Sequence, residues 1–155
     1  MEPNTPSTHL HEERNTITRL LALLKQEQCH LIAADIDQLS ALTPQKSLLV
    51  QQMAGLARQR HGALAAAGFA AGEAGMTDWI AAASDAAGAA IWHEVLNLTR
   101  EAKEFNRLNG TLINKHMVHT RSVLNLLRPA PPSGNFYGPN GQSTSNPTNR
   151  GFVVG

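Results

Sequence analysis

The sequence predicts an all-α protein: an elongated antiparallel helical bundle or coiled coil with a long C-terminal helix and a disordered tail. Apolar residues make up 42% of the chain but aromatic residues only 5%, and the apolar share is dominated by Ala and Leu, which favour helices over sheets. Residues 45–128 contain no proline, which leaves room for long helices because proline disrupts helix interiors. We therefore expect a helical domain over residues 1–128 and a tail over 129–155.

The first helix is expected over about residues 8–33. Ser7 or Thr8 can cap its start, and Glu12 and Glu13 complement the positive end of its dipole. Apolar residues then recur mostly at helical steps, which predicts an amphipathic helix with one apolar stripe. The stripe consists of Leu10, Ile17, Leu20, Leu21, Leu24 and Leu31.

The second helix is expected over residues 35–66, with Asp35 as its cap. Its apolar stripe has the spacing of a helix packed along a partner. The stripe consists of Leu39, Leu42, Leu49, Met53 and Leu56. Pro44 interrupts this segment, so the helix either kinks there or restarts with Thr43 as a cap and Pro44 at the first helical position.

The segment 62–75 is rich in Ala and Gly, and each glycine weakens a helix by about 1 kcal/mol relative to alanine. We place the connection between helices in this segment. Thr77 can cap a third helix over residues 77–87. Gly88 is a candidate interruption before the last helix.

The last helix is expected over residues 89–127, because apolar residues recur there at alternating steps of four and three. This seam consists of Ile91, Val95, Leu98, Ala102, Phe105, Asn109, Leu112, His116, His119, Val123 and Leu126. A continuous helix of this extent is roughly 58 Å long, which predicts an elongated architecture. A second stripe follows its C-terminal half, so one flank can pack internally while the other stays available. That stripe consists of Leu108, Ile113, Met117, Leu124 and Leu127.

The tail over residues 129–155 is rich in Pro, Gly and Asn, and Arg150 is its only charged residue. Such a composition cannot bury enough apolar area to offset the entropy of ordering. We expect this segment to be disordered in isolation. Its aromatic residues, Phe136, Tyr137 and Phe152, either form a recognition motif or are incidental.

Charge and cysteine usage exclude several classes of protein. The net charge is +1, so a nucleic-acid partner is not expected. Cys29 is the single cysteine. It cannot form an internal disulfide, so the cysteine content does not indicate an oxidising compartment. The first thirty residues have no apolar core of a signal peptide, and nowhere do 18 apolar residues run together. We therefore expect a cytoplasmic protein without stable membrane insertion.

The sequence predicts a protein that is not an enzyme and holds no metal or cofactor. Neither a phosphate-binding loop nor an H-E-x-x-H motif occurs. His116 and His119 have the spacing of a metal pair, but no further ligand completes a site. With Asn109 they are better explained as polar residues that fix the register of the seam.

Three motifs near the C-terminus occur in a characteristic order. They are Phe-Asn-Arg-Leu-Asn-Gly-Thr-Leu-Ile at 105–113, Val-Leu-Asn-Leu-Leu-Arg-Pro at 123–129, and Tyr-Gly-Pro-Asn-Gly-Gln at 137–142. Together they resemble the FlgN family of flagellar type III export chaperones. In that family an N-G-x-L element lies in the long final helix, a Leu-Leu-[KR]-Pro element ends it, and a Y-G-x-x-G-Q element follows in the tail. The resemblance extends more weakly to Lys-Ser-Leu-Leu at 46–49.

The resemblance implies a cytosolic chaperone without enzymatic turnover. Such a chaperone binds the hook-associated (hook-filament junction) proteins, prevents their premature assembly and delivers them to the flagellar export apparatus. The cargo-binding region of the family maps here onto Leu108, Leu112, Ile113, Met117, Val123, Leu124 and Leu127. The family's tail tyrosine, which is associated with docking to the membrane export gate, corresponds to Tyr137.

A structural protein is the alternative that the residues leave open. In this interpretation the apolar stripes serve only self-association, as in a homodimer or a larger helical bundle. A structural oligomer stays assembled with or without a client, whereas a chaperone exchanges its self-contacts for the client.

Overall fold

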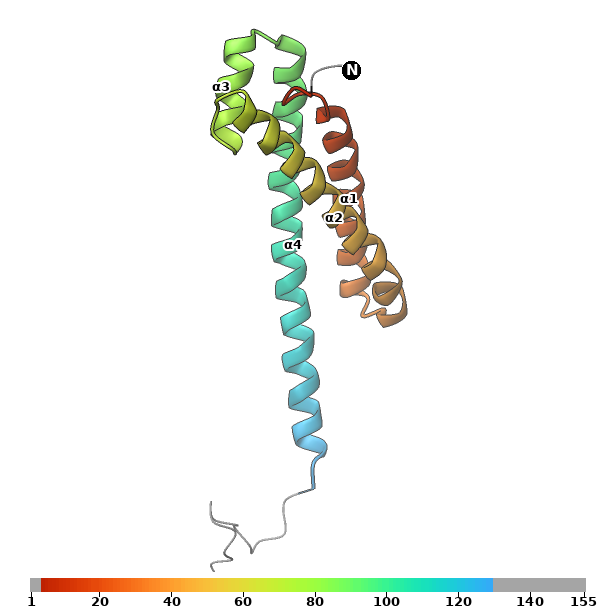
Figure 1. Ribbon diagram of the computed structural model, residues 1–155. Coiled ribbons are helices and arrows are strands. Elements are labelled where there is room, and N and C mark those ends of the chain that lie inside the picture. Colours follow the sequence, from red (N-terminus) through yellow and green to blue (C-terminus); the bar gives the residue numbers. More distant parts are fainter. Residues whose placement is uncertain (1–3, 130–155) are drawn as a thin grey trace, which may run out of the picture. The chain divides into compact units, whose positions relative to one another are not determined.

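The computed structural model describes residues 4–129, which form four α-helices and no strand (Figure 1). The helices are α1 (Leu10–Ile32), α2 (Ile36–Ala66), α3 (Glu73–Ala83) and α4 (Ala86–Leu127). The all-α prediction is confirmed, and so is the long C-terminal helix, since α4 has 42 residues. Residues 130–155, most of the predicted tail, lie outside the described part of the chain.

The chain divides into two compact units, residues 1–118 and residues 119–155. The described part of the first unit holds α1, α2, α3 and α4 as far as residue 118. The described part of the second unit holds the last turns of α4. Between residues 4 and 129, no helix is long and apolar enough to cross a membrane.

Within the first unit, consecutive long helices alternate in direction (Figure 1). The α2 helix runs antiparallel to α1, and α4 runs parallel to α1. Two ion pairs between α1 and α4 follow this order: Arg14 with Glu94 at 3.3 Å, and Lys25 with Glu101 at 2.8 Å. The antiparallel arrangement of successive helices is as the sequence predicts.

Two hydrophobic clusters hold these helices together. One cluster joins the middle of α1 to α2 and α4 and contains the buried residues Ile17, Leu20, Leu21, Leu23, Leu24, Leu42, Leu49 and Ala102. The other joins the start of α1, the end of α2, α3 and the start of α4 and contains Leu10, Leu64, Met76, Ile80, Trp92 and Val95. All four helices therefore contribute apolar side chains to the core, as amphipathic helices do.

The start of α1 differs from the prediction. The helix begins at Leu10, and His9 stands at the cap position without a side-chain cap. The predicted caps, Ser7 and Thr8, are engaged in the preceding turn: their hydroxyl groups lie 3.2 Å and 3.0 Å from the Thr5 hydroxyl. Because these hydroxyls bond locally, they do not cap the helix.

The start of α2 is as predicted, because Asp35 Oδ1 accepts a 3.2 Å hydrogen bond from the Gln38 amide. The helix is not broken at Pro44, which lies inside it. Thr43 is not a cap, since its hydroxyl donates to the Leu39 carbonyl at 3.2 Å. That bond returns to the carbonyl four residues back and is compatible with a continuous helix.

The connection between α2 and α3 is shorter than predicted and spans residues 67–72. The α3 helix begins at Glu73 rather than at Thr77. Thr77 lies inside the helix, where its hydroxyl donates to the Glu73 carbonyl at 3.0 Å instead of capping the start. Gly75 lies inside α3 and is buried. A Cβ at this position would collide with the backbone carbonyl of Ala70, so the glycine is required by this close approach.

The boundary between α3 and α4 also differs from the prediction. The α3 helix ends at Ala83, and Ser84 follows with φ of 53°. The α4 helix begins at Ala86, so Gly88 does not interrupt the chain before the last helix. Instead, the Gly88 amide donates to Asp85 Oδ1 at 2.8 Å. Asp85 thereby caps the helix, and a Cβ at Gly88 would collide with that carboxylate.

Candidate functional site

The apolar seams of the three long helices contain charged and polar residues at core positions. In α1 the seam follows steps of three and four and consists of Leu10, Glu13, Ile17, Leu20, Leu24, Glu27 and Leu31. In α2 it consists of Leu42, Lys46, Leu49, Met53, Leu56, Arg60 and Ala63. Each of these charged residues finds a partner on another helix. Because a buried polar residue is costly unless it is paired, such residues fix the register of helices that pack together.

Glu13 and Arg60 form one of these pairs. Arg60 Nε donates to Glu13 Oε1 at 2.9 Å, and the carboxylate residue is only 1% exposed. The guanidinium lies over the Trp92 ring, 4.6 Å from its centroid, so α4 also contributes. Glu13 is therefore a buried ion-pair partner and not only a charge at the helix end. Its position in the α1 seam is the sequence feature that could have indicated this role.

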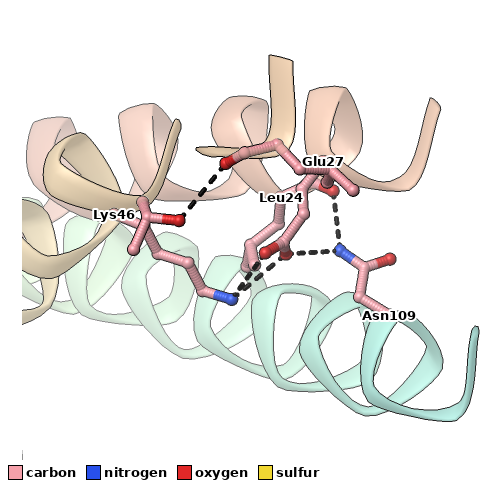
Figure 2. A network of polar contacts seen from close by, with 6 residues as sticks. Leu24, Glu27, Lys46 and Asn109 are labelled. Atoms are coloured by element: carbon pink, nitrogen blue, oxygen red, sulfur yellow. Dashed lines mark hydrogen bonds and ion pairs between the residues drawn. The ribbon is translucent and has the colours of Figure 1, made fainter. Parts of the chain in front are cut away.

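Glu27 forms the second polar contact, with one partner on each neighbouring helix (Figure 2). Lys46 Nζ on α2 lies 3.0 Å and 3.1 Å from the two carboxylate oxygens of Glu27. Asn109 Nδ2 on α4 donates to Glu27 Oε2 at 2.8 Å and to the Leu24 carbonyl at 2.9 Å. This Glu27–Lys46–Asn109 network holds three helices at one level.

The two ionic contacts impose the same antiparallel register on α1 and α2. Glu13 and Glu27 are two heptads apart on α1, and Lys46 and Arg60 are two heptads apart on α2. A shift of either helix by one turn would break both contacts at once. Buried polar groups of this kind are costly when unpaired, which favours a single alignment.

The same side of α4 faces α1 at two positions one heptad apart. Asn109 is 1% exposed and bonds the Leu24 carbonyl, and His116 Nε2 lies 2.8 Å from the Leu31 carbonyl. Both residues were predicted to fix the register of the seam. On either side of this contact line, Leu108 and Ile113 of α4 are exposed.

The predicted cargo-binding residues in the first unit flank this contact line. Leu112 lies between Asn109 and His116 in the seam and is half-buried. Leu108, Ile113 and Met117 are exposed, and Met117 retains 49% of its accessible surface. The helix therefore places Leu112 at the edge of the core and leaves the other three available to a partner.

The predicted residues in the second unit are all exposed. Val123, Leu124 and Leu127 lie in the last turns of α4, and the exposed fractions of the two leucines are 57% and 73%. Tyr137, the predicted gate-docking residue, lies outside the described residues.

The charged residues that follow Glu104 are all basic. Arg107 donates to both carboxylate oxygens of Glu104, at 2.9 Å and 2.7 Å, and these hydrogen bonds hold the pKa of the Glu104 carboxyl below its usual value. No Asp or Glu follows Glu104 in the sequence, whereas Lys115, Arg121 and Arg128 do. The exposed apolar side chains of α4 from Ile113 onwards are thus accompanied by positive charge alone.

An apolar groove was not anticipated from the sequence. It has a volume of about 280 Å³ and lies between α2 and α4, over α1. Its lining consists of Ile17, Leu20, Leu24, Lys46, Val50, Met53, Thr99, Ala102, Lys103 and Asn106. The run Leu48-Leu49-Val50 indicates exposed apolar surface on this helix. Three successive residues point in different directions around a helix, so one interface cannot bury all three. Leu49 is buried, and Leu48 and Val50 are exposed.

Comparison with known proteins places this architecture in one family. No curated protein and no solved structure matches the chain. The family model described as FlgN protein matches residues 1–145, which includes all four helices and the three C-terminal motifs. The chain therefore belongs to the FlgN family, a family of flagellar export chaperones.

Proposed function

We propose that this chaperone binds hook-associated proteins in the cytoplasm, prevents their premature assembly and delivers them to the flagellar type III export apparatus. Cargo binding is assigned to the predicted residues Leu108, Leu112, Ile113, Met117, Val123, Leu124 and Leu127. Family membership supplies the export-chaperone role, and the cargo, its site and its delivery are the proposal.

The exposure of apolar side chains on α4 is the observation that supports this proposal best. Of the twelve large apolar side chains that are exposed between residues 4 and 129, eight lie on α4 from Leu108 onwards. Single exposed apolar residues are common on proteins, but a concentration of this kind marks an interaction surface. Amphipathic helices are the natural partners of such a helical stripe.

The charge of this region specifies the cargo further. Because Lys115, Arg121 and Arg128 accompany the stripe from Ile113 onwards and no acidic residue follows Glu104, the cargo segment should carry Asp or Glu beside its apolar face. Complementary charge accelerates association and sets orientation, and salt screens it. We therefore expect the association rate to fall as ionic strength rises.

Titration calorimetry with the terminal segments of the hook-associated proteins tests the assignment. Replacing Leu124 and Leu127 together with Asp should weaken binding by more than about 100-fold, because burying each leucine contributes about 1.5–3 kcal/mol. Asn125→Asp with Leu126→Asp is the matched control, because it adds the same two charges: both residues are exposed, Leu126 by 85%, and neither is one of the proposed contacts. Circular dichroism should show unchanged helicity in all three proteins.

Equal losses in the Leu124 and Leu127 variant and in the charge-matched Asn125 and Leu126 control would mean that added negative charge, and not these two leucines, weakens binding. Unchanged affinity in the Leu124 and Leu127 variant would move the site elsewhere. Sedimentation distinguishes the structural alternative, since a homodimer that persists at saturating cargo would favour self-association as the role of the stripe.

Delivery to the export gate is proposed to depend on Tyr137. Tyr137→Ala should leave cargo affinity unchanged and weaken binding to the membrane export gate. Secretion of the hook-associated proteins and motility measure this step. Normal motility in the variant would remove the tyrosine from the mechanism.

A further inference from the structure

The groove between α2 and α4 is an open position at which a further helix could pack against α1, α2 and α4. Its floor is formed by buried apolar residues of α1, Ile17, Leu20 and Leu24, and Val50 and Lys103 stand exposed on its two sides. Two helices flank an open apolar floor, which is the surface against which a further amphipathic helix packs in a bundle.

One face of α4 continues from this groove toward the predicted cargo-binding residues. Thr99, Lys103 and Asn106 line the groove, and steps of four and three lead from them to Gly110, Ile113 and Met117. Residues at this spacing share one side of a helix. We call this set, Thr99, Lys103, Asn106, Gly110, Ile113 and Met117, the groove face of α4.

Gly110 is the residue of this face that has no side chain. It is exposed, and a Cβ added there would meet no atom within 4 Å. The helix does not need a glycine here for its own packing, and glycine weakens a helix interior by about 0.5–1 kcal/mol. Gly110 is adjacent to Asn109 in the chain but points about 100° away from it around the helix, so Asn109 faces α1 while Gly110 lies on the groove face.

We propose that an amphipathic helix of a partner, with acidic residues beside its apolar stripe, packs along the groove face of α4 and into the α2–α4 groove, with Gly110 at the point of closest approach. This inference rests on the proposed cargo-binding function and extends its site from Ile113 and Met117 back to Lys103 and Val50. The face from Thr99 to Met117 is about 27 Å long, which accommodates about five turns of a partner helix.

The occupant is a helix because of the volume and the backbone chemistry of the groove. A volume of about 280 Å³ is at the lower limit for a small-molecule pocket, roughly 300 Å³, and suits a few inserted side chains. The walls are helices whose interior backbone groups already bond one another. An extended peptide would bury backbone donors and acceptors without partners, whereas a helix satisfies its own.

The charge of the groove selects an acidic partner over a second copy of this chain. Two lysines, Lys46 and Lys103, line the groove together with no acidic residue. Lys46 is paired with Glu27, and Lys103 has no ion-pair partner between residues 4 and 129. The exposed apolar part of α4 in a second copy would bring Lys115 and Arg121 and no carboxylate, so its charge does not complement Lys103.

Gly110 permits the close approach because it adds no side chain between the two helix axes. Helices pack 8–10 Å apart depending on the side chains at the contact, and small residues allow the nearer distances. A bulky side chain at Gly110 would separate a partner helix from Lys103 and Met117 on either side. It would not disturb the fold, because the site is open.

The first test measures binding of a fluorescently labelled synthetic helix to the full chain by anisotropy. The probe is a peptide of about 18 residues, about five helical turns, with leucines at heptad positions and glutamates beside them. Gly110→Leu should lower its affinity at least about tenfold and leave thermal stability equal or higher. Gly62→Leu is the matched control, because Gly62 is an exposed helical glycine of α2 that also has open space around its Cβ position.

The second test is an exchange of charge. Lys103→Glu should weaken the glutamate-flanked probe about tenfold and strengthen a counterpart with lysines in place of the glutamates. Arg58→Glu is the control, since Arg58 is exposed on α2, outside the groove lining and away from the exposed apolar stripe of α4. Wild-type affinity in Gly110→Leu, or equal binding of both probes by the unmodified chain, would overturn the inference. A dimer of the unmodified chain that Gly110→Leu dissociates would also overturn it, since a second copy would then be the occupant.

The same variants separate this inference from the proposed function. If cargo segments bind and the double substitution of Leu124 and Leu127 abolishes that binding while Gly110→Leu does not, the cargo site stands and the extended face is wrong. If cargo segments do not bind but the acidic probe binds in the predicted pattern, the cargo assignment is wrong and the face stands.

Discussion

Replacing Asn109 with aspartate tests how α4 is held against α1 and α2. The substitution keeps the shape of the side chain but exchanges its Nδ2 donor for an acceptor. Both hydrogen bonds of Asn109 are lost, the 2.9 Å bond to the Leu24 carbonyl and the 2.8 Å bond to the Glu27 carboxylate. A second carboxylate is placed in contact with Glu27 at a position that is only 1% exposed in the native protein.

The expected loss of stability follows from these contacts. A neutral hydrogen bond contributes about 1 kcal/mol and one to a charged group about 1.5–3 kcal/mol. Two unit charges 2.8 Å apart repel by about 6 kcal/mol at an effective dielectric constant of about 20, and Lys46 offsets part of this repulsion. We therefore expect Asn109→Asp to lower the free energy of unfolding by about 3–5 kcal/mol at pH 7.

The loss should depend on pH in a defined direction. Burial and the neighbouring Glu27 carboxylate raise the pKa of the introduced carboxyl above the ordinary value of about 3.9. Its ionisation then destabilises the folded state above that ordinary pKa, and the deficit shrinks as the pH falls through the raised pKa. In the protonated form the carboxyl again donates a hydrogen bond.

Urea unfolding followed by circular dichroism at pH 7 and pH 5 measures both effects. Asn114→Asp is the matched control, because Asn114 is exposed on the same helix and the chemical change is identical. A deficit below about 1 kcal/mol, or one that is equal at both pH values, would show that the Glu27–Lys46–Asn109 network does not hold α4 in place.

Three further predictions concern stability and are measured by the same unfolding experiment. Glu13→Leu alone should cost about 3–5 kcal/mol because it leaves a buried guanidinium unpaired, whereas Glu13→Leu with Arg60→Met should recover most of that loss; additive effects of the two substitutions would contradict the pairing. Gly75→Ala should destabilise because its Cβ meets a backbone carbonyl, while Gly62→Ala should stabilise by about 0.5–1 kcal/mol, and the opposite order would refute the packing at Gly75. Asp35→Ala should cost about 0.5–2 kcal/mol through the lost cap, and an unchanged midpoint would remove Asp35 from that role.

The exposed stripe on α4 could be predicted from the sequence because it depends on spacing along one helix. Ile113, Met117 and Leu124 recur at steps of four and seven beside the main seam, which is more apolar surface than one internal interface buries. The α2–α4 groove could not be predicted in this way. It needs Ile17, Val50 and Lys103 from three helices, and no pattern within one helix shows how far apart two others stand.

The helix boundaries could likewise be predicted only in part from the sequence. Asp35 caps α2 as its residue type predicts, whereas Ser7, Thr8 and Thr77 do not cap their helices. These hydroxyl groups have several backbone and side-chain partners within reach. Which partner is used depends on the turn in which each residue lies.

Four helices, their apolar seams and the polar positions Asn109, His116 and His119 in the last seam follow from spacing along the chain. Asn109 lies in its seam by spacing, which predicts a role in helix register. Glu13 was predicted only as a charge at the start of its helix, and the core positions of Glu13 and Glu27 emerged from the packed helices. The pairing of Arg60 with Glu13, and the contacts of Lys46 and Asn109 with Glu27, became evident from the packing of the helices. The physical reason is that periodicity fixes the direction of a side chain around its own helix, while a partner is fixed by the register between helices distant in sequence.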